Sequence, residues 1–97
     1  MPTIEEIKKT AALVGQQYGV EKIFLFGSYA RGDNNESSDI DFRIDKGSIR
    51  GLFQLCGFKN KLEDILGRDV DVLTTQSLDD KFLSSIAKEE ILLYANK

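Results

Sequence analysis

Apolar residues recur along the chain at spacings that predict alternating helices and strands. Thr3 and Glu6 match a capping box at the start of a helix, and Gly19 suits the left-handed position that ends one. Between these limits the apolar residues share one helical face, at Ile4, Ile7, Ala11, Val14 and Tyr18. The apolar run at residues 23–26 then predicts a strand that is buried on both faces.

The segment at residues 39–45 alternates between apolar and polar side chains, which predicts a strand with one face in the core. A short helical turn at residues 28–32 and a polar loop at residues 33–38 are expected before it. The apolar face of this strand would carry Ile40, Phe42 and Ile44, and its other face would carry Asp39, Asp41, Arg43 and Asp45.

Apolar spacing predicts another helix within residues 48–66, closed by Gly67. Gly57 lies inside this segment, so we expect the helix to begin or break near it. Residues 70–73 then predict a third strand.

The C-terminal part of the chain predicts a helix at residues 78–88, with Phe82, Leu83 and Ile86 facing inward. Residues 91–94 fit either a final edge strand or an extension of that helix. Together these elements predict a single domain over residues 1–97, of the α/β or α+β class, in which helices pack on a small, mixed, mostly four-stranded sheet.

Composition narrows the function. Acidic residues outnumber basic ones by 16 to 13 in the 97-residue chain, so sequence-independent nucleic-acid binding, which needs a basic face, is not expected. The chain has no histidine, which excludes Ser-His and Cys-His catalysis and the usual zinc sites. Its single cysteine, Cys56, has apolar neighbours and is expected to be a small buried residue.

The N-terminus, MPTIEEIKK, lacks the basic and apolar regions of a secretion signal. No apolar run approaches the length that crosses a bilayer. We therefore expect a soluble protein of the cytoplasm with no membrane partner.

The stretch FGSYARGDNNESSDIDFRI, residues 26–44, joins two predicted strands through a Gly-Ser turn and a polar loop. Gly27 has no Cβ, so the backbone there can turn tightly and approach an anion, and the Ser28 hydroxyl would add a donor for a phosphate oxygen. Taken alone, a Gly-Ser pair after a strand is more often an ordinary turn. The lysine of Walker-type phosphate loops is also missing.

The aspartates favour a phosphate site over an ordinary turn. Asp39 and Asp41 are two residues apart in a predicted strand, so both carboxylates point to the same face. They repel each other unless a cation lies between them, and Mg²⁺ takes such oxygen ligands together with substrate phosphates. Two such ions can hold both the attacking and the leaving oxygen of a phosphoryl transfer.

Asp71 lies between two valines in a predicted strand, where an unpaired charge is unfavourable. If this strand neighbours residues 39–45, the three aspartates converge; the alternative is an edge-strand charge that prevents aggregation. Asp33, Asp45 and Asp69 fit loop or strand-end charges better.

Gly27-Ser28, ten intervening residues and then Asp39-Ile40-Asp41 resemble the signature of the DNA polymerase β-like nucleotidyltransferase superfamily. The fuller string GSYARGDNNESSDIDFRI, with GRDVDVL downstream, is similar to its minimal nucleotidyltransferase, or MntA-like, family, and the similarity covers nearly the whole chain. The resemblance implies a polymerase β-like fold and transfer of AMP from ATP to a tyrosine of a HEPN-domain toxin, encoded beside this antitoxin.

The resemblance also implies roles for single residues. Gly27 and Ser28 would hold the triphosphate, and Asp39, Asp41 and Asp71 would ligate two Mg²⁺ ions, with Mn²⁺ as an alternative. Asp71 would in addition help to activate the incoming hydroxyl. Arg31 would either contact a phosphate or brace the acidic loop through an ion pair.

The length of the chain bears on the acceptor, because a catalytic core of this size leaves no second domain to hold a small molecule or an RNA end. A partner protein brings its own structure, which favours a protein acceptor. Two alternatives stay open: a non-catalytic subunit that neutralises a toxin by covering it, and the catalytic subunit of a small-molecule, aminoglycoside-type nucleotidyltransferase. The pattern also leaves open whether the nucleotide is ATP or another nucleoside triphosphate, and whether the protein forms homo-oligomers or hetero-oligomers.

Overall fold

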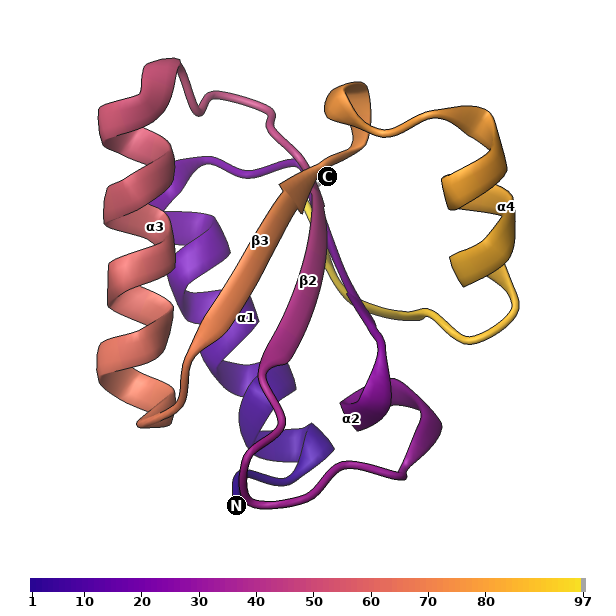
Figure 1. The fold of residues 1–97 in the computed structure, drawn as a ribbon. Coiled ribbons are helices and arrows are strands. Elements are labelled where there is room, and N and C mark those ends of the chain that lie inside the picture. Colours follow the sequence, from indigo (N-terminus) through magenta and orange to yellow (C-terminus); the bar gives the residue numbers. More distant parts are fainter. Residues whose placement is uncertain (97) are drawn as a thin grey trace.

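The computed structural model describes residues 1–96, in which helices cover a central sheet (Figure 1). The elements follow in the order α1 (Ile4–Tyr18), β1 (Lys22–Phe26), α2 (Ser28–Arg31), β2 (Ile40–Asp45), α3 (Gly51–Leu66), β3 (Val70–Thr74), the 3-10 helix η1 (Thr75–Ser77), α4 (Asp80–Ala87) and β4 (Ile91–Ala95). The sheet has four strands, as predicted, and the mixed α/β class is confirmed.

The strands lie in the order β3-β2-β1-β4. The strand β1 pairs antiparallel with both β2 and β4, whereas β2 and β3 are parallel. The C-terminal segment is therefore an edge strand and not an extension of α4, because its backbone pairs with the free side of β1. The parallel register places Asp41 beside Asp71, and the antiparallel register places Phe26 on the other side of Asp41.

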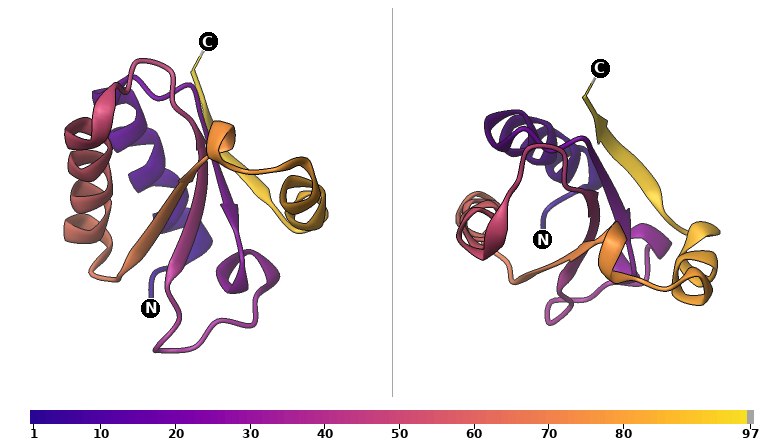
Figure 2. Two further views of the ribbon diagram at one scale, coloured as in Figure 1. Left: turned by 45° about the horizontal axis from the view of Figure 1, so that its top comes forward. Right: turned by 90° about the horizontal axis from the view of Figure 1, so that it is seen from above.

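The main core lies between one face of the sheet and the helices α1 and α3, which run along that face (Figures 1 and 2). Ile40, Phe42 and Ile44 of β2 are fully buried there, as the alternation predicts. On α1 the predicted face is buried at Ile7, Ala11 and Val14, whereas Ile4 is 41% exposed because it lies in the first turn. The prediction that Cys56 is buried is wrong, because this residue lies on the outer face of α3.

The start of α1 and the ends of α1 and α3 lie where the sequence predicts them. The Thr3 hydroxyl accepts a hydrogen bond from the Glu6 amide at 3.1 Å, and Gly19 and Gly67 end α1 and α3 in the left-handed conformation. The predicted break at Gly57 is wrong, because α3 is continuous from Gly51 to Leu66. A Cβ at Gly57 would lie 3.1 Å from the Tyr18 hydroxyl, so the missing side chain lets α1 and α3 pack closely instead of interrupting the helix.

The other face of the sheet is covered more sparsely, by α4 (Figure 2). Phe82 of α4 packs edge to face on Phe26 with ring centroids 6.1 Å apart, and Ile86 is buried below it. Phe82 is still 37% exposed and Leu83 is half-buried, so of the three residues predicted to face inward on α4 only Ile86 is buried. No helix within residues 1–96 combines the length and the apolar character needed to cross a membrane.

Candidate active site

Two of the three predicted aspartates meet on the sheet face that α4 partly covers. Because β2 and β3 are parallel and in register at Asp41 and Asp71, their side chains leave the same face of the sheet at neighbouring positions. Asp39 precedes β2 by one residue and shares the face of Asp41. Asp71 is exposed and Asp41 is half-buried, so the carboxylates line a surface that solvent can reach.

The turn between β1 and α2 lies directly against Asp41. Gly27 has a φ of 77° and a ψ of −156°, a conformation that side chains strongly disfavour. A Cβ at this residue would lie 2.2 Å from Oδ2 of Asp41, so only glycine allows the two to approach this closely. Ser28 follows at the start of α2, and within residues 1–96 its hydroxyl has no hydrogen-bond partner. The predicted phosphate turn and the predicted carboxylates thus lie side by side in the fold.

The carboxyl group of Asp41 is electrostatically strained. Burial raises its pKa to about 6, and the neighbouring charges of Asp71 and Asp39 add to this shift, while Arg31 opposes it. The carboxyl group therefore holds its proton more tightly than an ordinary aspartate. A cation placed among these carboxylates would relieve the repulsion.

Arg31 lies at the C-terminal end of α2, where its guanidinium contacts two carboxylates. Its Nε donates to Asp33 at 3.1 Å and its Nη1 donates to Glu89 at 2.7 Å. The hydrogen bond to Glu89, followed by the one to Asp33, raises the pKa of Arg31 above its usual value. Of the two roles expected for this residue, the brace on the acidic loop is present in this structure.

Comparisons with known proteins identify the family of this chain. A family model described as polymerase beta nucleotidyltransferase matches residues 5–97. The chain belongs to this family. Members of the nucleotidyltransferase family are enzymes that transfer a nucleotidyl group, so the chain carries the domain of an enzyme.

Among curated relatives, the chain is 38% identical over 88 residues to a Methanocaldococcus jannaschii protein named provisionally as the protein adenylyltransferase MJ0435, with 91% of this chain and 95% of the relative aligned. It is 32% identical over 95 residues to the protein adenylyltransferase MntA of Thermococcus cleftensis, covering 94% of this chain and 96% of the relative. These nucleotidyltransferases match this chain over nearly their full lengths.

Solved structures agree on the fold. A structure described as a minimal nucleotidyltransferase superposes with a TM-score of 0.80 at 26% identity, covering 93% of this chain and 95% of that one. A chain of a complex described as the tri-AMPylated HEPN toxin of Shewanella oneidensis with an MNT antitoxin superposes with a TM-score of 0.73 at 18% identity, covering 97% of this chain and 74% of that one. The polymerase β-like nucleotidyltransferase fold is thereby confirmed.

The residues of the candidate site have the chemistry that hard divalent cations require. Carboxylate oxygens from Asp39, Asp41 and Asp71 suit Mg²⁺, and Asp41 already carries a raised pKa that a cation would lower. As the side chains stand in residues 1–96, no three His, Cys, Asp or Glu side chains form a preassembled metal cluster. The assignment of these aspartates as metal ligands therefore rests on their shared face and donor chemistry.

The sequence did not reveal a buried ion pair on the same face. Arg43, two residues beyond Asp41, donates to Glu90 at 3.0 Å through Nε and at 2.7 Å through Nη2. Its Nη1 donates to the Thr75 hydroxyl at 2.8 Å, and its guanidinium lies 4.0 Å above the Phe24 ring. The alternation of residues 39–45 placed Arg43 on the polar face, but nothing in a single sequence indicates a partner so far along the chain.

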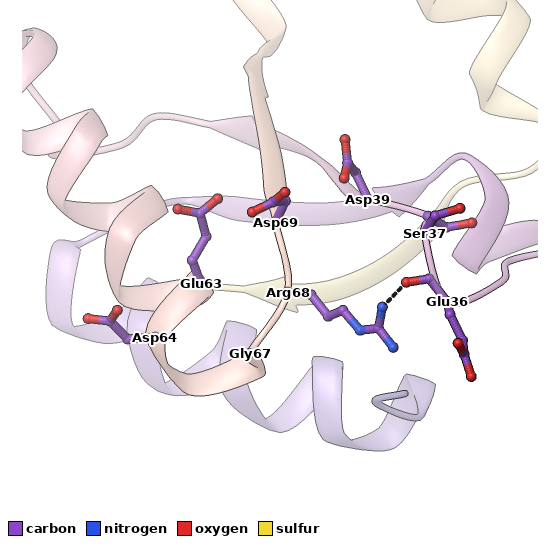
Figure 3. Close-up of a pocket in the computed structure, with 9 residues that line it drawn as sticks. Glu36, Ser37, Asp39, Glu63, Asp64, Gly67, Arg68 and Asp69 are labelled. Atoms are coloured by element: carbon purple, nitrogen blue, oxygen red, sulfur yellow. Dashed lines mark hydrogen bonds between the residues drawn. The ribbon is translucent and has the colours of Figure 1, made fainter.

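A cavity of about 550 Å³ lies beside the candidate site, between the loop before β2 and the C-terminal end of α3 (Figure 3). It is lined by Glu36, Ser37, Ser38, Asp39, Glu63, Asp64, Gly67, Arg68 and Asp69. Carboxylates dominate this lining, and the guanidinium of Arg68 hydrogen-bonds the Glu36 carbonyl. This concentration of negative charge disfavours an anionic ligand in the cavity. Asp69 lies at this cavity, as expected for a charge at the end of a strand.

Proposed function

We propose that this protein transfers AMP from Mg²⁺-bound ATP to a hydroxyl group, most simply that of a tyrosine, on a partner protein. The partner would be a HEPN-type toxin, which the transfer silences, so that the pair acts as a toxin–antitoxin system in the cytoplasm. The observation that carries the proposal is the register that brings Asp41 beside Asp71, with Gly27 directly against Asp41.

The names of the similar proteins support the nature of the transferred group and of the acceptor. Both relatives described above are called protein adenylyltransferases. The toxin in the similar complex is described as tri-AMPylated and bound to its MNT antitoxin. At 32–38% identity over almost the whole chain, transfer of AMP to a protein is the reaction that these names favour for this chain.

The chemistry follows from the positions of the side chains. Gly27 and Ser28 would bind phosphate oxygens of ATP, and Asp39, Asp41 and Asp71 would hold Mg²⁺, which offsets negative charge on the phosphates and orients them. The acceptor hydroxyl oxygen forms a bond to the α-phosphorus of ATP. The bond from that phosphorus to the oxygen bridging to the β-phosphate breaks, and pyrophosphate leaves. The exposed carboxylate of Asp71 would take the hydroxyl proton.

The test distinguishes turnover from stoichiometric contact. Wild-type protein, mixed with ATP, Mg²⁺ and the neighbouring gene product at well below one molecule per acceptor, should raise the acceptor mass by whole AMP units. The Asp39→Asn/Asp41→Asn variant should fail even in excess, although it would still bind. Asp45→Asn is the matched control, because the same chemical change falls on the same strand face but beside Thr75.

Two results would overturn the proposal. If the double variant neutralises the partner as well as wild type does and the mass never changes, the protein acts by covering its partner. If the protein modifies a small molecule such as an aminoglycoside and not the neighbouring gene product, the acceptor class is wrong.

A further inference from the structure

Two consecutive glutamates in the turn between α4 and β4 each hold one arginine. Glu89 accepts from Arg31 at 2.7 Å, and Glu90 accepts from Arg43 at 2.7 and 3.0 Å. Arg31 belongs to α2, directly after the Gly27–Ser28 turn, and Arg43 belongs to the strand that carries Asp41. One short turn therefore connects both halves of the candidate site.

The two ion pairs differ in how deeply their side chains are buried. The side chains of Arg43 and Glu90 are 11% and 15% exposed, that of Glu89 is 23% exposed, and that of Arg31 is 48% exposed. Glu90 makes a bidentate contact with a buried arginine, which anchors the turn directly beside Glu89. The buried Arg43–Glu90 pair thus adjoins the Glu89–Arg31 pair, in which Arg31 is the most exposed of the four side chains.

We propose that Glu89 is a positioning residue for the nucleotide, which acts by holding the Arg31 guanidinium beside the Gly27–Ser28 turn for contact with a phosphate. This inference rests on the proposed function, in which a triphosphate binds at that turn. An arginine side chain loses much rotamer freedom when it binds an anion, and a carboxylate that already orients it removes part of that loss.

Two further observations agree with this role. Within residues 1–96 the guanidinium of Arg31 makes hydrogen bonds only to Asp33 and Glu89, which leaves some of its N–H donors for a phosphate. Arg31 is the last residue of the four-residue helix α2, which begins at Ser28. Residues three apart lie on the same side of a helix, so Arg31 and Ser28 share one side of α2.

The variant Glu89→Gln tests the sign of the effect. Removing a negative charge near an anionic ligand tightens binding if charge alone matters. Positioning predicts the opposite: the dissociation constant for AMP-PNP with Mg²⁺, measured by calorimetry, should rise about two- to fivefold, as for a partly exposed ion pair. Glu21→Gln makes the same charge change at the other end of β1 and should bind like wild type.

A double-variant comparison shows whether Glu89 acts through Arg31. Arg31→Gln should weaken AMP-PNP binding, and adding Glu89→Gln to it should weaken binding no further. Glu89→Asp, which keeps the carboxylate, should restore part of the affinity lost in Glu89→Gln. Thermal unfolding of each variant checks that the fold is retained.

Each other outcome overturns the inference. If Glu89→Gln binds the analogue as tightly as wild type or more tightly, or if the effects of the two substitutions add, Glu89 does not position Arg31. If wild type itself fails to bind AMP-PNP with Mg²⁺, the proposed function fails and this inference fails with it. If wild type binds the analogue and only the results for Glu89 differ from those expected, this inference alone fails.

Discussion

Asp41 is the residue at which the two halves of the candidate site meet. On one side its carboxylate lies so close to Gly27 that no side chain fits between them, and on the other side it has Asp71 as its register partner. Its raised pKa, about 6, is a consequence of this crowding, with burial as the first cause and Asp71 as the next. A group so placed destabilises the folded protein when it is charged and no cation is present.

The first prediction concerns the free energy by which the charged Asp41 destabilises the fold. A carboxyl group with a folded-state pKa near 6 stabilises the fold below its unfolded-state pKa, 3.8, and loses that contribution as the pH rises through 6. Asp41→Asn should therefore be more stable than wild type at pH 7 without metal, by about 1 kcal/mol after allowance for solvent screening. Urea unfolding should show the difference disappearing toward pH 4. A wild type that is equally stable or more stable at pH 7 would contradict the strain at Asp41.

The second prediction compares two glycines with a positive φ, of which only Gly27 combines it with an extended ψ and lies against Asp41. Gly27 and Gly32 both have a positive φ, but a Cβ at Gly32 meets nothing within 4 Å. Gly32→Ala should thus cost about 1 kcal/mol of unfolding free energy. Gly27→Ala should cost at least about 2 kcal/mol and should also weaken nucleotide binding, because it displaces Asp41. Equal losses of stability and of binding in the two variants would show that the contact with Asp41 is unimportant.

The site residues that could be predicted from the sequence are those that lie close to one another along the chain. Asp39 and Asp41 share a face because side chains alternate along a strand, and Gly27 and Ser28 follow a recognisable apolar run. The partner of Arg43 lies 47 residues away, in a turn whose position depends on how α4 packs. Such a pair follows from tertiary structure and leaves no periodic trace in one sequence.

At the scale of elements, the glycines of α3 show where local rules fail. Helix propensity penalises Gly57, and the sequence therefore predicted a break there. In the structure the cost is offset by packing, since the position faces Tyr18, whose ring stacks edge to face on Phe58 at 5.8 Å. Propensity is a local quantity, and the contact between α1 and α3 overrides it.

The third prediction concerns the turn that joins α4 to β4. Glu90→Gln leaves the buried guanidinium of Arg43 without its charged partner, although Asp45 lies 3.8 Å from Nη1. This should cost about 3 kcal/mol of unfolding free energy. Glu89→Gln, one residue earlier, breaks an exposed pair and should cost less than about 1 kcal/mol. Denaturant unfolding of both variants measures the contrast, and similar losses would mean that the buried pair does not anchor the turn.

At the scale of the whole molecule, the strand order decides whether the site exists. The pattern of apolar residues predicted a mostly four-stranded sheet. The convergence of Asp71 with Asp39 and Asp41 could be predicted only on the condition that their strands are neighbours. Nothing in a single chain fixes that order, because strands of similar composition can pair in several ways. The long crossover through α3 makes the β2–β3 pair parallel and meets the condition.

The last prediction follows from the whole site being assembled from three separate parts of the fold. Mg²⁺ would be held by carboxylates of β2 and β3, and the phosphates by the turn after β1, so metal and nucleotide should stabilise each other's binding. ATP with Mg²⁺ should raise the melting temperature by more than the sum of the two shifts that ATP and Mg²⁺ produce singly. When the concentration of the metal–nucleotide complex is a hundred times its dissociation constant, binding adds about 2.7 kcal/mol to the free energy of unfolding. Excess chelator should remove most of this gain, and Asp41→Asn should remove it too, whereas Asp45→Asn should keep it. An ATP-dependent shift of the same size in wild type with chelator present would show that the carboxylates and the Gly27–Ser28 turn do not act as one metal–nucleotide site.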